Sequence, residues 1–81
     1  MSIYILSENQ KAWIESRLGN DASGYLVKTS TITWLVEKII NDKIEIDQEW
    51  IKNQLDDTSG NIVSINTIIS IIRHFVACKS R

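Results

Sequence analysis

The chain has 81 residues, 43% of them hydrophobic and 23% charged, which predicts one small folded domain over residues 1–81 and excludes a disordered segment. Nine Lys and Arg against ten Asp and Glu leave a net charge of −1, so the chain lacks the overall basic excess of a nucleic-acid-binding protein. The single cysteine excludes an intramolecular disulfide and a cysteine-based zinc site, and no apolar run approaches the roughly 20 residues of a membrane span. We therefore expect a cytoplasmic protein with no membrane partner, metal or other cofactor.

The first predicted elements are a strand and a helix. Residues 2–6 are β-branched and aromatic, which favours a short strand. Ser7 and Gln10 follow as a capping box, so a helix is expected to begin near residue 8. Gly19 and Asn20, which tolerate positive φ, are expected to end it. Its narrow apolar stripe consists of Trp13, Ile14 and Leu18.

A second helix follows a connection over residues 21–28, whose apolar part, residues 25–27, is expected to fold back on the core. An N-cap is offered by Thr29, Ser30 and Thr31, and the helix should run to about Asn41. Its apolar residues recur at i, i+3, i+4, i+7 and i+8, which predicts one buried face. They are Ile32, Leu35, Val36, Ile39 and Ile40. Residues 43–46 then alternate, as in either a short strand or an extended linker.

The second half contains two further helices. Asp47 is the expected N-cap of a third helix, which carries Trp50, Ile51 and Leu55. Residues 63–76 hold the widest apolar stripe of the chain and predict the central helix of the core, wide enough to extend into a subunit interface. The stripe consists of Ile65, Ile68, Ile69, Ile71, Ile72, Phe75 and Val76.

The two halves of the sequence repeat one another. A Trp-Ile pair recurs after 37 positions, and Ser-Gly and Thr-Ile pairs recur after 36, so one deleted residue reconciles the two offsets. We interpret this as a duplication, with halves of about 1–42 and 43–81 that cover each other's apolar faces with pseudo-twofold symmetry. The predicted fold is mainly α, with a short N-terminal strand and four helices in two tandem helix-turn-helix-like hairpins. The repeated pairs are Trp13-Ile14 with Trp50-Ile51, Ser23-Gly24 with Ser59-Gly60, and Thr31-Ile32 with Thr67-Ile68.

The first half resembles the ribbon-helix-helix antitoxins of the ParD type. The shared features are a short strand, the Trp13-Ile14 pair in the first helix, a Ser-Gly-aromatic turn at residues 23–25 and an amphipathic second helix. The resemblance implies a homodimer that binds duplex DNA as an autoregulator and wraps a toxin with its C-terminal part. Two features depart from the family: the connection between the first helices is longer, and the second half copies the first. A fused pseudo-dimer is therefore an alternative, with residues 44–46 in place of the second strand.

In that family, paired strands from two subunits enter the major groove. Matching at Trp13 turns Tyr4 and Leu6 toward the protein. Ile3 and Ile5 then point outward, although their apolar side chains cannot hydrogen-bond a base. The resemblance also implies a phosphate clamp made by the backbone amides of Thr29, Ser30 and Thr31.

The second half also resembles a helix-turn-helix recognition unit between residues 63 and 72. Ser64 would cap a helix whose first exposed side chains meet the DNA groove. The candidate DNA contacts are Ser64, Asn66, Ser70 and Arg73, with Lys28, Ser30 and Thr33 as counterparts in the first half. The alternative is an ordinary capped helix, because Ser and Asn are common at any helix start.

Candidate partner-binding residues are Trp34, Tyr25, Lys79 and Arg81. Trp34 lies off the apolar stripe of its helix, so it is either covered by residues 25–27 or exposed as an anchor for a protein partner. The basic C-terminal residues alternatively complement the dipole of the last helix.

Catalysis is not expected. His74 and Cys78 lie one helical turn apart, but the sequence offers no acid or second base to orient them. The sequence therefore predicts a non-enzymatic regulator similar to ParD-type antitoxins, which binds DNA, a protein partner, or both. The alternative is a phage- or plasmid-type inhibitor or adaptor that blocks a host complex without binding DNA.

Overall fold

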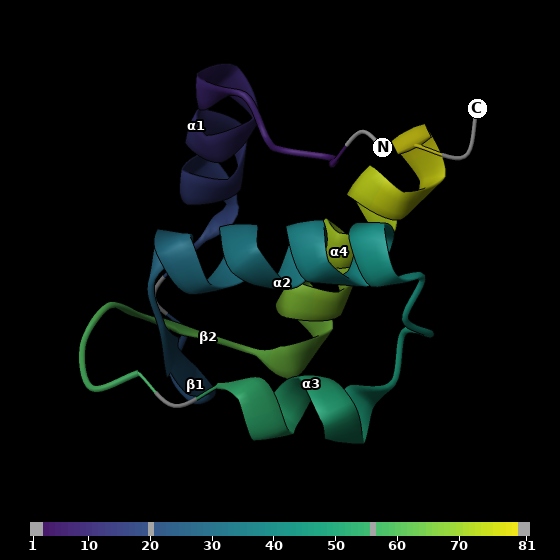
Figure 1. Ribbon diagram of the computed structural model, residues 1–81. Coiled ribbons are helices and arrows are strands. Elements are labelled where there is room, and N and C mark those ends of the chain that lie inside the picture. The colour runs from purple at the N-terminus through teal and green to yellow at the C-terminus, as the bar shows by residue number, and fades with distance from the viewer. Residues whose placement is uncertain (1–2, 20, 56, 80–81) are drawn as a thin grey trace.

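The computed structural model describes residues 3–19, 21–55 and 57–79. This part of the chain is mainly helical, with four helices and one two-stranded antiparallel sheet. The elements run α1 (Glu8–Arg17), β1 (Tyr25–Val27), α2 (Thr29–Asp42), α3 (Gln48–Gln54), β2 (Asn61–Val63) and α4 (Ile65–Lys79). Helices α2 and α4 cross in the middle of the molecule, with α1 on one side and α3 on the other (Figure 1).

Helix α4 lies at the centre of the core, as its apolar stripe predicts. Its inner face is buried against α2, α1 and α3, and that face consists of Ile68, Ile71, Ile72 and Phe75. The predicted stripe of α2 is buried as well, at Ile32, Leu35, Val36 and Ile39. The shorter helices contribute Ile14 and Ile51, each fully buried. Burial of an isoleucine side chain is worth about 1.5–3 kcal/mol, so this shared core is the main stabilising feature of the fold.

The sequence does not predict the sheet. Its pattern indicates a folded-back connection at residues 25–27 and places residue 63 in the final helical stretch. Both segments instead form strands of three residues, paired in the register Tyr25 with Val63, Leu26 with Ile62 and Val27 with Asn61. Strands this short leave no alternating pattern to detect. The central pair joins residues 36 positions apart, the same offset as the sequence repeat.

A glycine precedes each strand where the two halves approach most closely. Gly24 has a φ of +151° and Gly60 a φ of +127°, both in the region that favours glycine. A Cβ atom on Gly24 would overlap the carbonyl group of Val63, and one on Gly60 would overlap that of Val27. The repeated Ser-Gly pairs therefore mark the two sites where backbone meets backbone.

The predicted N-terminal strand is wrong: the described chain before α1 is extended but unpaired with any strand, and Ser2 lies outside the described residues. Its hydrogen bonds go to side chains of α2. The N–H of Tyr4 donates to Oδ1 of Asn41 (2.7 Å), and Nδ2 of Asn41 donates to the Tyr4 carbonyl (3.0 Å). The N–H of Leu6 donates to Oε2 of Glu37 (2.9 Å). These side chains of α2 take the place of a neighbouring strand.

The helix starts follow the capping signals more closely than the helix ends do. The Ser7 capping box and the Asp47 cap form as predicted. The residue that follows α1, Leu18, has an extended conformation. The Leu18 carbonyl accepts a hydrogen bond from Nδ2 of Asn61 (3.0 Å). The expected positive-φ ending at Gly19 is therefore not used, and Asn20 lies outside the described residues.

The sequence left two alternatives for residues 43–46, a short strand or an extended linker. The structure shows a linker between α2 and α3. Lys43 closes α2 with a left-handed φ of 54°, and the N–H of Ile44 bonds the Ile39 carbonyl (3.0 Å). Residues 44–47 then carry no regular secondary structure. They have no strand partner in the described chain, which is why their alternation does not produce a strand.

Candidate functional site

The start of α2 was the predicted phosphate clamp, and a carboxylate from the other half of the chain now occupies it. The N–H of Lys28 donates to Oδ2 of Asp57 (3.0 Å), and the hydroxyl of Thr31 donates to Oδ1 (3.0 Å). Thr29, Ser30 and Thr31 form the first helical turn, instead of the cap that was predicted for them, and Lys28 is the cap residue. A phosphate at this position would meet the negative charge of Asp57.

The start of α4 is built in the same way. The N–H of Ser64 donates to Oδ2 of Asp21 (2.9 Å), and its hydroxyl accepts from the N–H of Thr67 (3.3 Å). Ser64 therefore caps α4, as predicted. Asp21 and Asp57 are 36 positions apart, and so are the two amides that they bind. Each half of the chain thus supplies the carboxylate that caps the other half's long helix.

The connections from α1 to α2 and from α3 to α4 lack the ligands of a calcium-binding helix-loop-helix. Twelve-residue calcium loops need an oxygen ligand at position 1, glycine at position 6 and a bidentate glutamate at position 12. With Gly24 and Gly60 at position 6, the first positions are Gly19 and Leu55, and the twelfth are Ser30 and Asn66. Within the described ranges, no group of three His, Cys, Asp or Glu residues is placed to hold a metal ion.

Two of the predicted DNA contacts lie together in a crevice between α1 and α4. Asn66 and Ser70 share its lining with Arg17, and the cavity volume is about 550 Å³. Arg73 is exposed on α4 but does not line this crevice. Arg17 was not predicted, because its only sequence signal is a basic residue in the last turn of a helix. The lining is completed by Trp13, Thr67, Ile71 and His74.

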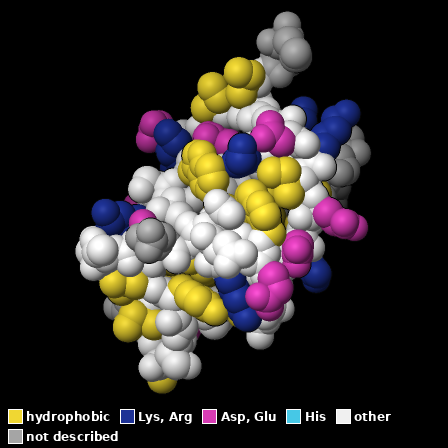
Figure 2. Space-filling view, turned by 60° about the horizontal axis from the view of Figure 1, so that its bottom comes forward, with side chains coloured by type: hydrophobic (Ala, Val, Ile, Leu, Met, Phe, Trp, Pro, Cys, Tyr) yellow, Lys and Arg dark blue, Asp and Glu magenta, His cyan; other side chains and the backbone are white. Residues whose placement is uncertain are grey.

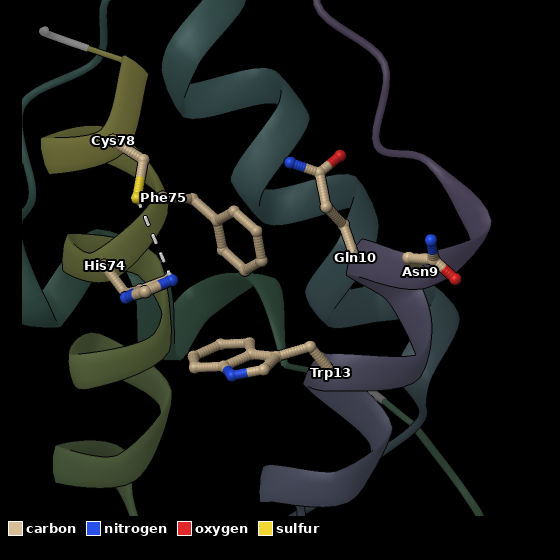
Figure 3. A pocket seen from close by; sticks show the side chains of 6 residues that line it. All are labelled: Asn9, Gln10, Trp13, His74, Phe75 and Cys78. Atoms are coloured by element: carbon tan, nitrogen blue, oxygen red, sulfur yellow. Dashed lines mark hydrogen bonds between the residues drawn. The ribbon is translucent and has the colours of Figure 1, made fainter.

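An aromatic cluster separates this crevice from a second one of about 240 Å³ (Figure 3). The rings of Trp13 and His74 stack at 4.3 Å between centroids and 18° between planes, and Phe75 meets Trp13 edge-on at 5.3 Å. The guanidinium of Arg17 lies 4.8 Å from the Trp13 ring centroid. The indole is thus already engaged by three neighbours, two of them on α4, which makes it a structural contact between α1 and α4.

His74 and Cys78 do approach each other in this second crevice. The Cys78 Sγ lies 3.9 Å from Nε2 of His74, as the dashed line in Figure 3 shows. The other polar residues that line this crevice, Asn9 and Gln10, carry amide side chains. No carboxylate is among the described residues of the lining. This geometry lacks the third group with which nucleophile and base act together.

Trp34 is an exposed residue of α2, 44% accessible. Residues 25–27, which were the predicted partial cover, pair with β2 in the sheet. The Lys38 Nζ lies 5.8 Å from the Trp34 ring centroid. A crevice of about 340 Å³ lies beside the indole, lined by Lys11, Thr29, Ser30, Thr33, Trp34 and Glu37.

The other predicted partner-binding residues are spread over different elements. Tyr25 is half-buried in β1, and Lys79 is exposed at the end of α4, with its Nζ 5.7 Å from the Tyr4 ring centroid. Arg81 lies outside the described residues. On the face shown in Figure 2, hydrophobic side chains surface as separate patches divided by charged ones. This face therefore offers several small apolar surfaces and not one continuous apolar surface.

Comparisons with known proteins were made for the whole chain. No protein-family model, curated protein or solved structure matches it. None of the helices in the described ranges combines the length and the apolar character needed to cross a bilayer.

Proposed function

We propose that the protein is a small, non-enzymatic, cytoplasmic regulator that acts by holding a protein partner. The observation that carries the proposal is the exposed Trp34 on α2. Tryptophan is enriched among the few residues that dominate binding energy, and this one is 44% accessible on the surface of α2. The adjoining crevice supplies polar neighbours that can fix the orientation of an inserted side chain.

The resemblance to ParD-type antitoxins supports a toxin as this partner. The alternative partner is a host complex that the protein blocks, as an inhibitor or adaptor would. The reciprocal caps and the 36-residue register support the further proposal that both halves derive from one helix–strand–helix unit with pseudo-twofold symmetry.

DNA binding is the second candidate, and one observation favours it. Asn66 and Ser70 lie in the α1–α4 crevice with Arg17, and Arg73 is exposed on the same helix. Asn, Ser and Arg side chains on an exposed helix surface can hydrogen-bond base edges in the major groove. Against this, Asp21 and Asp57 place negative charge at both helix N-termini, where phosphates would be held. We therefore rank protein binding first.

The protein-binding proposal is tested with immobilised wild type and Trp34→Ala in extract of the native host. We expect the variant to lose partner retention by about 30-fold or more, as for a binding hot spot of about 2 kcal/mol. Ile62→Ala is the matched control, because Ile62 is also an exposed apolar side chain, 38% accessible, and does not line the crevice. Unchanged retention by Trp34→Ala would refute the proposal, and so would a loss of thermal stability that marks Trp34 as core.

DNA binding is tested separately by retention on mixed duplex DNA at low salt. Protein binding alone predicts no retention. Retention that falls steeply with rising salt would instead support the DNA candidate, because the slope reports the number of phosphates contacted. In that case Arg73→Ala should reduce the slope by about one phosphate.

A further inference from the structure

The crevice beside Trp34, formed by Lys11 of α1 and one face of α2, contains an unpaired buried hydroxyl in its lining. Thr33 is 8% accessible, which is too buried for the DNA contact that the sequence suggests. Within the described ranges, its Oγ1 is the only buried side-chain oxygen or nitrogen without a hydrogen bond. An unpaired buried hydroxyl destabilises a fold, so a ligand that brings a partner for it would recover the loss.

The Thr33 hydroxyl differs in this respect from other threonine hydroxyls at the helix starts. The Thr31 hydroxyl donates to Oδ1 of Asp57 (3.0 Å), and the hydroxyls of Thr67 and Ser64 share a hydrogen bond (3.0 Å). A threonine in a helix populates two χ1 rotamers, which exchange the positions of its hydroxyl and methyl groups. Because the Thr33 side chain lines the crevice, rotation about χ1 can present its hydroxyl to a ligand there.

The charges of the lining select a neutral ligand. Lys11 provides a cation, and its Nζ lies 3.8 Å from Oε1 of Glu8, whose side chain is 94% accessible. Glu37 provides an anion whose Oε2 accepts the N–H of Leu6 (2.9 Å) and which forms no ion pair within the described ranges. A charged ligand of either sign would meet a like charge in this lining. A neutral group that accepts a hydrogen bond from Lys11 and donates one to Glu37 satisfies both side chains.

The indole of Trp34 supplies an apolar wall with ring surface to spare. Within the described ranges its one ring contact is with the Lys38 Nζ, 5.8 Å from the centroid, whereas the Trp13 ring is engaged by three neighbours. An aromatic ring packed against an indole gains more than its buried area alone provides. The crevice volume of about 340 Å³ is at the lower end of the range for ligand pockets and suits a single side chain.

We propose that this crevice receives a tyrosine side chain of the protein partner, with its ring against Trp34 and its hydroxyl beside Thr33, Lys11 and Glu37. A phenol hydroxyl donates one hydrogen bond and also accepts, so it matches a carboxylate that only accepts, an ammonium that only donates and a hydroxyl that does either. Tyrosine is also enriched in protein interfaces and among their hot spots. The inference rests on the proposed function, because it names the group that Trp34 holds.

The test uses a pair of small probes that differ only in the hydroxyl. N-acetyltyrosinamide and N-acetylphenylalaninamide are each titrated into the isotope-labelled full chain, and heteronuclear NMR follows the indole N–H of Trp34, which is assigned by its absence in Trp34→Phe. We expect a dissociation constant of about 1 mM for the tyrosine probe, as for other ligands of this size. The phenylalanine probe should bind about tenfold more weakly, because the polar groups of the crevice are then left without a partner.

Thr33→Val tests the buried hydroxyl directly. In the free protein this substitution removes an unpaired polar group at nearly constant shape, so the Tm should rise by about 5 °C or more. It should weaken the tyrosine probe by about threefold or more and leave the phenylalanine probe unchanged. Thr31→Val is the matched control, because the Thr31 hydroxyl bonds Asp57 and Thr31 does not line the crevice. In that variant the Tm should fall, and both probes should bind as they do to the wild type.

Equal binding of the two probes would overturn the inference, as would a Thr33→Val variant that loses stability or keeps its full affinity for the tyrosine probe. Tighter binding of N-acetylglutaminamide would also overturn it, in favour of a side-chain amide as the ligand. The proposed function fails in a different way. If the crevice selects the phenol but Trp34→Ala retains the partner as the wild type does, only the protein-binding proposal is refuted. If Trp34→Ala loses the partner but the crevice does not select the phenol, only this inference is refuted.

Discussion

The carboxylates of Asp57 and Asp21, which bond the starts of α2 and α4, are expected to stabilise the fold by different amounts. Asp57→Ala removes two hydrogen bonds to a carboxylate, one from the Lys28 N–H and one from the Thr31 hydroxyl. Loss of an N-cap costs about 1 kcal/mol, and the second bond to a charged group adds about as much. We therefore expect Asp57→Ala to lower the free energy of unfolding by about 2 kcal/mol, which corresponds to a Tm lower by about 8–16 °C in a domain of this size.

Asp21→Ala is the matched comparison. Asp21 accepts one bond, from the Ser64 N–H, and the Ser64 hydroxyl still caps α4 after the substitution. We expect a loss of about 1 kcal/mol or less. The measurement is urea unfolding followed by far-UV circular dichroism. The reasoning is refuted if Asp57→Ala destabilises the protein no more than Asp21→Ala does.

Three further outcomes are expected. Gly24→Ala and Gly60→Ala should each abolish cooperative thermal unfolding, because the new methyl group overlaps the opposite strand, whereas Gly19→Ala, with open space around it, should shift the Tm by only a few degrees. Ile72→Ala should lower the free energy of unfolding in urea by about 2–5 kcal/mol, and a smaller loss would place its side chain outside the core. The exposed Cys78 should release one equivalent of chromophore from a disulfide reagent without denaturant; slow release only after unfolding would contradict its exposure.

Local sequence patterns predicted the positions of the helices and the buried faces of the two longest ones. The spacing of apolar residues located the buried faces of α2 and α4, and the capping signals at Ser7, Asp47 and Ser64 located three helix starts. These signals act between residues three or four positions apart, so they can be read without knowing the fold. The sequence repeat likewise placed the matched pairs without any structure.

The candidate site residues could be predicted only where their neighbours lie on the same helix. Helical spacing placed Asn66 and Ser70 on one exposed face, but the neighbour Arg17 comes from α1 and could not be inferred locally. The exposure of Trp34 is likewise a matter of tertiary packing, because its helical position alone does not specify which distant segment lies beside it.

Only the tertiary structure decided where the short extended segments went. Residues 25–27 form a strand because residues 61–63 lie opposite them, whereas the backbone of residues 4–6 bonds side chains of α2. The Asp57 carboxylate meets the Lys28 N–H only because the fold places the start of α2 beside it. Hydrogen bonds of this kind join groups 26 to 43 positions apart, and no local pattern in the chain specifies which distant partner will satisfy them.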